Sequence, residues 1–528
     1  MENVKNFREL VEQCVVKRPD AVAFTWLDQN KEIKEKTYSE FISDINGLGT
    51  YFYYNGFKKA RVAVIGENSY DWILTYFATV IGKNVIVPID RDLKADAIVN
   101  VLKDSGAKLL VYSDAYNGII DDVRKRAGVK VINRNEIQKL ADEGKALIEK
   151  GKKKYLSIEI DEHEMSTIIY TSGTTGKPKG VMLCQYGIIQ SAYAAAENVK
   201  VKGPSMLVLP IHHTYGFTAG VIAVFFFEVP IIISGSLRTF VSDMQLFHPE
   251  NMFLVPMFVE SMYKKVMKTV EDKKLGAAFK ALRKTSNALR KFGIDGRKKI
   301  FKSVHEAFGG NLKIVISGGA SLDPLYCKYF DEFGITLLNG YGITECSPVV
   351  AVNSNNGTDP NKVGSIGKVL SCNEVKIINE DENGNGEICI KGSNVMLGYY
   401  NNKKATAEAF DGEWFKTGDL GYLDDDNYLY MSGRQKNLII LDNGKNIYPE
   451  ELEELILRIP DAIEAVVYSE NDVITAEIYT ENPSGVQLAI RELNKTLPIY
   501  KNITGLKFRT TEFEKTTTKK IKRNLVKA

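Results

Sequence analysis

The chain has 528 residues, of which 44 % are hydrophobic and 26 % are charged. These are globular values, so a mainly disordered chain is excluded, and the length predicts about two to four domains or subdomains. Basic residues number 69 and acidic residues 66, and this balance gives no general reason to expect a nucleic-acid partner. The 6 cysteines are scattered without a C-x-x-C pair, a pattern typical of a reduced, cytoplasmic protein.

Neither the N-terminal residues nor the most apolar stretch of the sequence predicts insertion into a membrane. The N-terminal residues MENVKNFREL are charged and contain no apolar segment of the secretory-signal type. The most apolar stretch, residues 216–235, is interrupted by Glu228 and Pro230, and its uninterrupted part is too short to span a bilayer.

The first third of the chain alternates β-branched strand runs with amphipathic helices. We expect strands at residues 61–66, 84–90 and 108–113, a helix over 70–81, and a less regular helix around 98–102. The pattern resumes with a strand at 313–319, a helix over 323–333 and a strand at 335–342. This alternation predicts a parallel sheet. The polar segment 134–160 is interpreted as a helix with a surface linker.

Residues 264–302 differ from the rest in charge. They carry 14 basic and 3 acidic residues, a net charge of +11, which leaves −8 for the remainder of a chain whose total is +3. Apolar residues such as Leu275, Phe279, Leu282 and Leu289 recur there at helical spacing. The segment is either a basic amphipathic helix that contacts anionic lipid or a phosphate-rich ligand, or a solvated helical face.

The composition changes again after about residue 436. A helix is predicted to begin near Pro449, strands at 464–469 and 473–480, a helix over 485–496 and a strand at 506–510. Together they predict a small α+β domain of about 90 residues, a size at which a domain can be independent.

The strongest chemical signal is YTSGTTGKPKG, Tyr170–Gly180. Glycines allow backbone amides to approach a ligand, hydroxyls donate to phosphate oxygens, and lysines supply positive charge. A phosphate-binding loop between two strands is therefore predicted, against the alternative of a flexible turn. It is not a Walker A loop, because Pro178 stands where that motif has Ser or Thr.

This motif resembles the phosphate loop of the adenylate-forming superfamily, which comprises acyl-CoA synthetases, luciferases and the adenylation domains of peptide synthetases. The resemblance extends over nearly the whole chain and implies an α/β fold. It implies a large N-terminal domain of layered sheets and helices at residues 1–435. A small, mobile C-terminal α+β domain would follow at residues 437–528, with a hinge at Lys436 where many members have Asp.

Further motifs follow in the family's order. YGITECSP, Tyr341–Pro348, resembles the Y-G-x-T-E motif, and implies Glu345 as a ligand of Mg²⁺, Thr344 as a donor to the α-phosphate and Tyr341 as a ring against adenine. SGGAS, Ser317–Ser321, resembles the stretch that lines the adenine site and the acyl pocket through its backbone; alone it would be a tight turn.

The stretch TGDLGYLDDDNYLYMSGR resembles the family's T-G-D and G-R positions. Asp419 would accept hydrogen bonds from the ribose hydroxyls, and Arg434 would contact ribose or phosphate. Asp424–Asp426 are interpreted as a hairpin turn rather than a metal site. Gly444 falls in the loop that borders the pantetheine tunnel of CoA-using members.

Near the C-terminus, EKTTTKKIKRN resembles P-K-T-x-x-G-K-I-x-R, and places Lys520 on the catalytic lysine. Glu514 replaces the usual Pro, and Lys519 replaces the usual Gly. The loss of Gly narrows the conformational range of the loop at position 519. LPIHHTYGFTAG resembles L-P-x-x-H-x-x-G, with His213 as the matching histidine at the carboxylate end of the acyl site. His212 is extra, and the sequence offers no third ligand for zinc.

The residues that the resemblance assigns fall into several groups. Nucleotide binding would involve Thr171, Ser172, Gly173, Thr174, Thr175, Gly176, Lys179, Gly318, Gly319, Ala320, Asn339, Gly340, Tyr341, Gly342, Thr344, Asp419 and Arg434. Substrate binding would involve His213, Gly318 and Gly340, and catalysis Lys520, Thr344 and Glu345.

The resemblance implies an ATP-dependent acid–thiol ligase of the long-chain fatty-acyl-CoA synthetase kind. A carboxylate would attack the α-phosphate of Mg·ATP, pyrophosphate would leave, and the CoA thiol would take the acyl group from acyl-AMP. The apolar residues 217–233 favour a fatty acid, and His213-Thr214-Tyr215-Gly216 lacks the Asp that amino-acid-activating relatives carry there. Two alternatives remain open: a ligase that loads the phosphopantetheine arm of an acyl carrier protein, and a non-catalytic nucleotide-binding scaffold. We expect a cytoplasmic protein, peripheral to the inner membrane face if the basic segment binds lipid.

Overall fold

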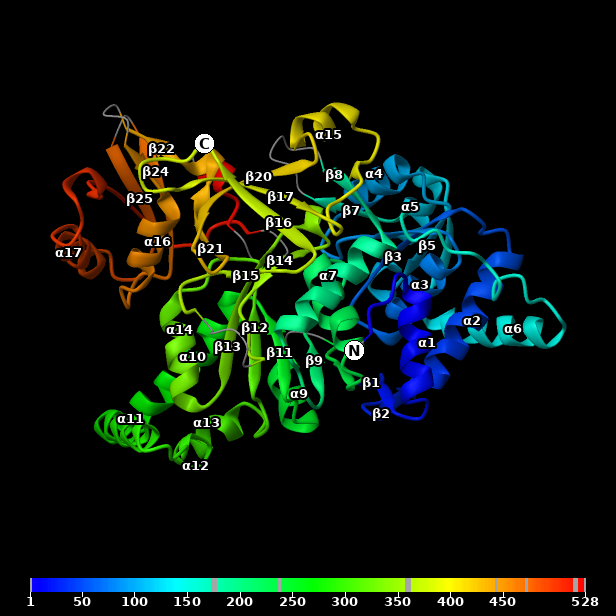
Figure 1. Cartoon of the computed structure of the whole chain (residues 1–528), viewed down its shortest axis with the longest axis horizontal. Coiled ribbons are helices and arrows are strands. Elements are labelled where there is room, and N and C mark those ends of the chain that lie inside the picture. The colour runs from blue at the N-terminus through cyan, green and yellow to red at the C-terminus, as the bar shows by residue number, and fades with distance from the viewer. Residues whose placement is uncertain are drawn as a thin grey trace. The chain divides into compact units, whose positions relative to one another are not determined.

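The computed structural model describes residues 2–171, 178–235, 239–356, 362–441, 445–470, 473–515 and 521–526. The chain forms two compact units. The large unit comprises Met1–Glu374 and Lys391–Phe410, and the small unit comprises Val375–Ile390 and Asp411–Ala528. The predicted fold class, a mixed α/β chain with a large N-terminal and a smaller C-terminal domain, is confirmed (Figure 1). The boundary and hinge at Lys436 stay predictions.

The first sheet of the large unit is mainly parallel. In spatial order its strands are β18 (Gly398–Tyr399), β8 (Lys179–Cys184), β7 (Met165–Thr171), β4 (Val85–Pro88), β3 (Arg61–Ile65), β5 (Leu109–Tyr112) and β6 (Lys130–Asn133). The exceptions are β8 and β18, which pair antiparallel with β7 and β8 respectively. The strands expected at 61–66, 84–90 and 108–113 are thus confirmed to within two residues.

Helices connect and cover these strands. They are α1 (Phe7–Lys17), α2 (Tyr38–Tyr54), α3 (Tyr70–Ile81), α4 (Ala95–Ser105), α5 (Ile120–Ala127), α6 (Ile137–Glu149), α7 (Gln185–Asn198) and α15 (Lys403–Ala409). α3 has the predicted bounds, because the Ser69 side chain accepts the backbone N–H of Trp72 and caps its first turn.

The interpretation of residues 134–160 as a helix with a surface linker is confirmed, since α6 is followed by a mostly exposed segment, but both parts also make buried contacts. α6 packs closely on α2: a Cβ at Gly144 would lie 1.8 Å from the carbonyl oxygen of Gly47. The following segment buries Tyr155, whose hydroxyl donates to the carbonyl of Ala78 at 3.0 Å. The polar composition concealed this contact, because small residues that allow close helix approach leave no apolar pattern.

The second sheet of the large unit continues the alternation. Its strands, in spatial order, are β15 (Gly367–Val369), β14 (Val349–Val352), β13 (Thr336–Gly342), β12 (Ile314–Ser317), β11 (Asn251–Leu254), β9 (Ser205–Leu207), β10 (Ile231–Ile233), β1 (Val22–Leu27) and β2 (Ile33–Thr37). The run from β13 to β1 is parallel, and β14, β15 and β2 are antiparallel to their neighbours. Parallel strands β12 and β13 bring two motifs, Ser317–Ser321 and Tyr341–Pro348, to the same edge of the sheet.

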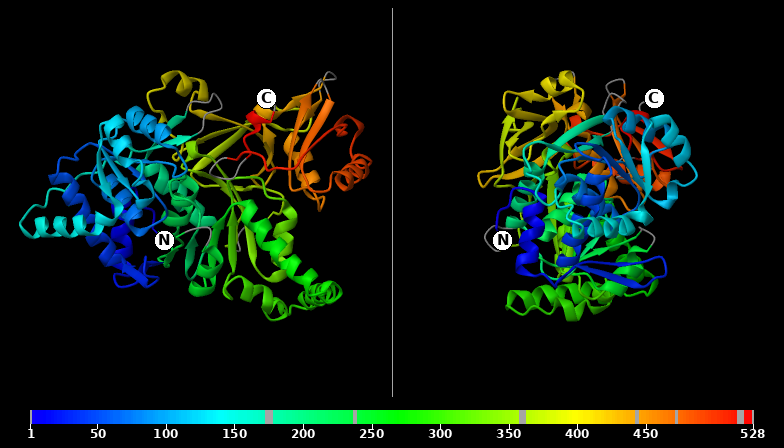
Figure 2. Two further views of the ribbon diagram at one scale, coloured as in Figure 1. Left: turned by 180° about the vertical axis from the view of Figure 1, so that it is seen from behind. Right: turned by 90° about the vertical axis from the view of Figure 1, so that its right-hand side faces the viewer.

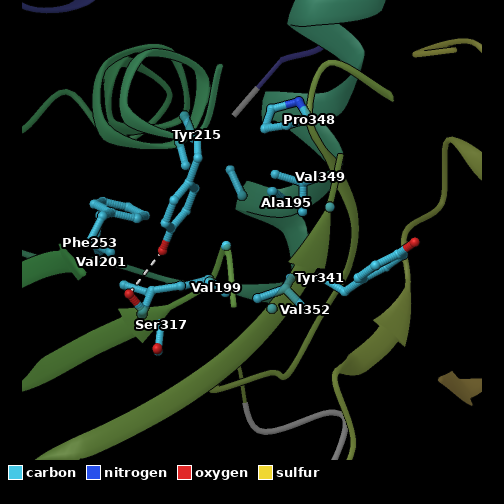
Figure 3. A pocket seen from close by; sticks show the side chains of 18 of the residues that line it. Ala195, Val199, Val201, Tyr215, Phe253, Ser317, Tyr341, Pro348, Val349 and Val352 are labelled. Atoms are coloured by element: carbon cyan, nitrogen blue, oxygen red, sulfur yellow. Dashed lines mark hydrogen bonds between the residues drawn. The ribbon is translucent and has the colours of Figure 1, made fainter. Parts of the chain in front are cut away.

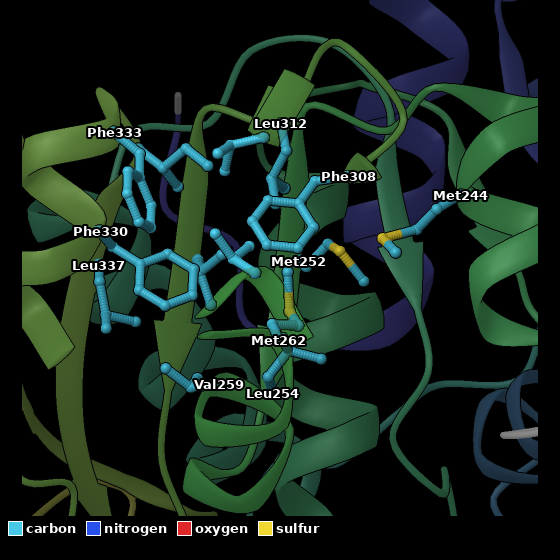
Figure 4. Close-up of a cluster of buried hydrophobic side chains, with 14 of the residues drawn as sticks. Met244, Met252, Leu254, Val259, Met262, Phe308, Leu312, Phe330, Phe333 and Leu337 are labelled. Atoms are coloured by element: carbon cyan, nitrogen blue, oxygen red, sulfur yellow. The ribbon is translucent and has the colours of Figure 1, made fainter. Parts of the chain in front are cut away.

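A hydrophobic cluster joins this sheet to the helices beside it (Figure 4). The helices of this region are α9 (Phe240–Phe247), α10 (Pro256–Asp272), α11 (Gly276–Lys291), α12 (Arg297–Ile300), α13 (Lys302–Ala307) and α14 (Pro324–Phe333). Phe330 and Phe333 of α14 belong to this cluster together with Met252 and Leu254 of β11 and Met262 of α10. Among the described residues, no helix is both long and apolar enough to cross a bilayer.

The small unit contains three groups of strands. These are β16 (Asn373–Ile378), β17 (Gly386–Gly392), β20 (Trp414–Leu423) with β19 (Phe410–Asp411) and β21 (Tyr428–Arg434); β22 (Ile439–Ile440) with β23 (Asn446–Ile447); and β24 (Glu464–Glu470), β25 (Val473–Tyr479) and β26 (Gly505–Arg509). Helices α16 (Pro449–Leu457) and α17 (Pro483–Asn494) pack on the last group, visible at the orange end of Figure 2. The predicted turn at Asp424–Asp426 is confirmed, since the Asp424 carboxylate accepts the backbone N–H groups of Asp426 and Tyr428.

Candidate active site

The predicted phosphate loop joins two antiparallel strands, as expected. Thr171, the last residue of β7, is paired with Lys179, the first residue of β8, and its hydroxyl lies 3.5 Å from the Lys179 carbonyl oxygen. The loop residues Ser172, Gly173, Thr174, Thr175 and Gly176 lie outside the described residues. The strand pair therefore places the two ends of the loop beside each other.

Tyr399 links the phosphate-loop lysine to the predicted magnesium ligand. The Lys179 ammonium lies 4.9 Å from the centroid of the Tyr399 ring, and the Tyr399 hydroxyl donates to Oε1 of Glu345 at 3.0 Å. Burial and the negative charge of Glu345 raise the pKa of Tyr399, so the hydroxyl stays a donor. Sequence reasoning missed this residue, because β18 pairs with β8 from more than 200 positions away and no local motif marks it.

The backbone around Glu345 is fixed as well. Thr344 and Glu345 lie in a short 3₁₀ turn, Thr344–Cys346, and the Glu345 carbonyl accepts the backbone N–H of Met396 at 2.7 Å. The Glu345 carboxylate is half-buried, and one of its oxygens is oriented by Tyr399. A carboxylate held in this way fits Mg²⁺, which prefers oxygen ligands and usually keeps several waters.

The glycines at the ends of β12 and β13 are required by close contacts. A Cβ at Gly342 would lie 2.1 Å from the carbonyl oxygen of Pro348, and one at Gly318 would lie 3.1 Å from Cζ of Tyr215. Gly319 has φ of +83°, the left-handed region that favours glycine. Gly319 and Ala320 are exposed, and Gly340 follows Asn339 in β13. These motifs therefore hold their backbone partly for internal packing reasons, which the sequence did not distinguish from ligand contact.

Asn339 and Tyr341 present polar atoms at this edge. The Asn339 amide donates to the Ser365 carbonyl at 3.3 Å, while its Oδ1 is buried and has no hydrogen-bond partner among the described residues. An acceptor left in this state is suited to an amino group such as that of adenine. In Figure 3 the Tyr341 ring points away from the apolar side chains around Tyr215.

An apolar cavity lies beside these strand ends (Figure 3). It has about 630 Å³ of space, open solvent included, and no charged side chain lines it within the described residues. Its lining residues come from α7, from the π-helix Tyr215–Ile222, and from the strand ends: Ala195, Ala196, Val199, Val201, Tyr215, Ala219, Ala223, Phe227, Phe253, Ile316, Ser317, Gly318, Gly319, Gly340, Tyr341, Gly342, Pro348, Val349 and Val352. The Tyr215 hydroxyl donates to the Ile316 carbonyl at 3.0 Å, so its polar end is satisfied. The stretch 217–233 thus supplies both core and cavity wall.

The histidine pair acquires a third partner in the fold. Nε2 of the buried His212 lies 3.3 Å from Oδ1 of Asp90, and the two histidine rings are 4.3 Å apart. The ligand atoms of Asp90, His212 and His213 all lie within 4.8 Å of one another. The expectation that the histidines have no third candidate ligand is therefore wrong. The sequence did not reveal Asp90, because it follows a strand more than 100 positions earlier and only the fold brings it close. The fold therefore places a carboxylate beside the buried His212 ring.

In the small unit, Asp419 and Arg434 occupy opposite positions of the β20–β21 pair. Nε of Arg434 lies 3.1 Å from Oδ1 of Asp419, which is only 1 % exposed. Lys436 follows in a 3₁₀ turn, where desolvation and the Arg434 charge lower its pKa. Gly444 lies outside the described residues.

The two sides of the C-terminal loop are paired with each other. Lys515 and Ile521 form an antiparallel bridge, and the backbone N–H of Lys522 donates to the Glu514 carbonyl at 2.8 Å. The Lys522 ammonium also lies 3.3 Å from the Glu514 carboxylate. Lys519 and the predicted catalytic Lys520 lie outside the described residues, between these paired sides.

Comparison with known proteins decides the family. Residues 11–400 match the AMP-binding enzyme family. The chain belongs to this family. Long-chain-fatty-acid–CoA ligase FadD15 of Mycobacterium bovis is 29 % identical over 425 residues, which cover 76 % of this chain and 69 % of that protein.

Solved structures of AMP-binding enzymes agree in fold. The o-succinylbenzoate-CoA synthetase MenE of Bacillus subtilis, in complex with its acyl-adenylate, has a TM-score of 0.76 at 22 % identity and covers 98 % of both chains. The anthranilate CoA ligase AuaEII, in complex with anthranoyl-AMP, has a TM-score of 0.79 at 18 % identity, and covers 100 % of this chain and 97 % of that one. At such identities the likeness concerns the fold.

These findings confirm the resemblance to AMP-binding enzymes and the predicted class, an AMP-forming acid–thiol ligase. The individual site residues stay predictions. The structure brings Lys179 and Glu345 together through Tyr399, and brings Gly318, Gly340, Tyr341 and Gly342 to one cavity.

Proposed function

We propose that this AMP-binding enzyme is an ATP-dependent fatty-acyl-CoA ligase. A fatty carboxylate attacks the α-phosphorus of ATP, acyl-AMP forms, and pyrophosphate leaves. The CoA thiol then attacks the acyl carbon, AMP leaves, and the thiol proton is released. The observation that carries the proposal is the apolar cavity that ends at Gly318 and Gly340, beside the nucleotide motifs.

The lining of the cavity supports a hydrocarbon chain. An amino acid or a dicarboxylic acid would bring an amine or a second carboxylate into a space where no described side chain carries a charge. Burying such a group without a partner costs several kcal/mol. A chain of methylenes has no such cost and is stabilised by about 0.8 kcal/mol per buried CH₂. The cavity therefore favours fatty acids over the polar acids that other family members use.

The nucleotide would be held by residues of several elements. Thr174, Thr175 and Lys179 would bind the β- and γ-phosphates, and Glu345 would hold Mg²⁺, which neutralises phosphate charge. Thr344 would donate to the α-phosphate, and His213 would border the acyl carboxylate. Asp419 and Arg434 would bind the ribose. Because phosphoryl transfer depends mainly on positioning and charge neutralisation, these contacts account for most of the chemistry.

Lys520 would stabilise the charge that builds between the carboxylate and the α-phosphate. A donor of this kind is worth roughly 10²–10³ in rate. Rotation about Lys436 would then exchange Lys520 for the loop of Gly444, which borders the path of the CoA pantetheine, a hinge transition. Membrane contact through residues 264–302 is a separate proposal, argued below.

The test is pyrophosphate release from Mg·ATP with acids of two to eighteen carbons, with and without CoA. We expect release to peak at one long chain length and to turn over only with CoA. Release that stalls near one equivalent despite CoA, and resumes with a phosphopantetheinylated carrier protein, would replace CoA by that acceptor. No release with any acid would favour the scaffold.

Lys520→Ala separates the two half-reactions. We expect this variant to lose adenylation by roughly 10²–10³ while forming acyl-CoA from supplied acyl-AMP at the wild-type rate. Lys519→Ala removes the same charge from the neighbouring position and serves as the control. Loss of both half-reactions in Lys520→Ala would contradict the role of Lys520.

A further inference from the structure

The arginines of the basic segment are bound to acidic residues of the protein. Arg283 pairs with Glu332 at 2.5 Å, Arg290 with Asp331 at 2.7 Å, and Arg297 with Asp331 at 2.8 Å. Arg283 and Arg290 are seven positions apart on α11 and so lie on one face, together with Phe279, which packs against Phe301 and Phe333. This face attaches α11 to α14.

The lysines of the same segment are arranged differently. All eleven are exposed. Lys302 pairs with Glu306 and Lys264 lies near the Glu260 carboxylate, whereas none of the other nine has an ion-pair partner in the part of the chain that the structure describes. These nine are Lys265, Lys268, Lys273, Lys274, Lys280, Lys284, Lys291, Lys298 and Lys299. Arginines and lysines of the segment therefore differ in their surroundings. The arginines form ion pairs with acidic residues of the protein, and the lysines face solvent.

Exposed apolar side chains accompany these lysines. Phe292 is 82 % exposed and Ile294 55 %, directly after α11, while Leu275 (47 %) precedes the helix and Leu282 (42 %) lies within it. An aromatic and an aliphatic side chain in solvent beside lysines match the composition of helices that lie in a membrane interface. We call these nine lysines and four apolar residues the basic surface.

The basic surface lies away from the candidate active site. β11–β13 are parallel, and Gly318 and Gly340 belong to their carboxyl-terminal ends. α10 follows β11 and runs back over 17 residues, about 25 Å, toward the amino-terminal ends. Figures 1 and 2 show α11 and α12 beyond those ends of the strands. Substitutions on the basic surface therefore leave the cavity lining untouched.

We propose that the basic surface docks the protein on an anionic lipid bilayer. The lysines attract acidic headgroups, and Phe292 and Ile294 enter the boundary between headgroups and acyl chains. Each lysine near such a surface is worth about 1 kcal/mol, which corresponds to roughly five-fold in the partition coefficient. A nucleic acid would use the lysines but would leave Phe292 and Ile294 in water, so the apolar residues favour lipid. The proposal is independent of the chemistry at the active site.

The test is co-sedimentation of the full-length protein with vesicles of phosphatidylcholine alone or with added phosphatidylglycerol. We expect binding only to the anionic vesicles and a decrease as salt is raised. The variant Lys280→Gln, Lys284→Gln, Lys291→Gln should reduce the partition coefficient roughly 100-fold. The matched control, Lys150→Gln, Lys153→Gln, Lys154→Gln, removes three exposed lysines of the α6 region and should bind like wild type.

The apolar contribution needs its own variant. Phe292→Ala with Ile294→Ser should weaken binding to anionic vesicles about ten-fold at high salt, where lysine attraction is screened. Pyrophosphate release with a short, water-soluble acid should stay at the wild-type rate in every variant and reports folding. Equal binding to both vesicle types, or an equal loss in the control triple, would overturn the proposal. So would absence of vesicle binding together with salt-sensitive binding to duplex DNA.

Discussion

The residues predicted to form the site are held by shape in the large unit and by charge in the small unit. Gly318 and Gly342 sit where a single added carbon would meet Tyr215 or the carbonyl of Pro348. Asp419 is buried and paired with Arg434. Glu453 of α16, which is not a predicted site residue and is 12 % exposed, pairs with Arg523 in the segment that follows the Lys520 loop.

The difference predicts how each part responds to perturbation. Close-packed backbone tolerates pH and salt but not added volume. Partly or fully buried carboxylates beside an arginine tolerate small changes of volume but respond strongly to any change in their charge, because burial penalises the charged form while the arginine favours it. Adding a methyl group to a glycine of the cavity wall should therefore lower stability. The stability of the small unit should instead depend on pH.

Among the substitutions proposed here, Gly342→Ala should have the largest effect. The new Cβ would lie 2.1 Å from the Pro348 carbonyl oxygen, so β13 or β14 must move. We expect the free energy of unfolding to fall by about 3 kcal/mol or more, with loss of adenylation, in urea titrations and pyrophosphate assays. Gly118→Ala is the control, since a Cβ there meets nothing within 4 Å. Equal stability of the two variants would mean that shape does not fix this wall.

Glu453→Gln tests the charge-dependent half. Burial raises the pKa of Glu453 from its ordinary value of 4.5 to about 7, although the Arg523 charge and the backbone N–H of Val467 oppose the shift. Between those values the folded protein holds a proton that the unfolded chain has released, so the stability contributed by this group falls as pH rises from about 4.5 to about 7. The full decrease is on the order of 3 kcal/mol.

Urea titrations at pH 5, 6, 7 and 8 measure this slope. We expect wild type to lose stability across the series relative to Glu453→Gln, which has no proton to release. Glu481→Gln changes an exposed glutamate of the same unit and should keep the wild-type slope. Parallel curves for wild type and Glu453→Gln would show that Arg523 holds the carboxylate charged at every pH tested.

Sequence reasoning succeeded where a property is carried by neighbouring residues. The 3.6-residue period of the apolar residues in Tyr70–Ile81 predicted α3 with its observed bounds, and the structure adds the cap at Ser69. The motif order predicted the family, because each glycine-rich or acidic stretch follows a recognisable strand. The position of Gly342 at a strand end was equally visible, although its contact with Pro348 was not.

It failed where two distant segments supply one contact. Tyr399 reaches Glu345 only because β18 pairs with β8, and Asp90 reaches His212 across two different sheets. The packing of α6 on α2 depends on Gly47 and Gly144, which add nothing to a hydrophobic pattern. In the basic segment, composition alone could not separate lysines from arginines by role, since the acids that bind the arginines lie on α14.

Tyr399→Phe should give the smallest effect and sharpens the comparison most, because Tyr399 makes a charge-related contact with Glu345 in the large unit, where Gly318 and Gly342 are held by shape. The variant keeps the ring beneath Lys179 and removes only the hydroxyl that donates to Glu345. A hydrogen bond to a charged group contributes about 1.5–3 kcal/mol, so we expect at least a ten-fold loss in kcat/KM for adenylation. If the hydroxyl orients a magnesium ligand, the concentration of Mg²⁺ for half-maximal pyrophosphate release should rise as well.

Tyr400→Phe is the control, because it makes the same chemical change at the neighbouring position, where the ring lies 5.2 Å from the Arg61 guanidinium. This variant should leave the Mg²⁺ dependence unchanged. A lower rate with an unshifted Mg²⁺ dependence would reduce Tyr399 to a packing residue and leave charge to the small unit alone.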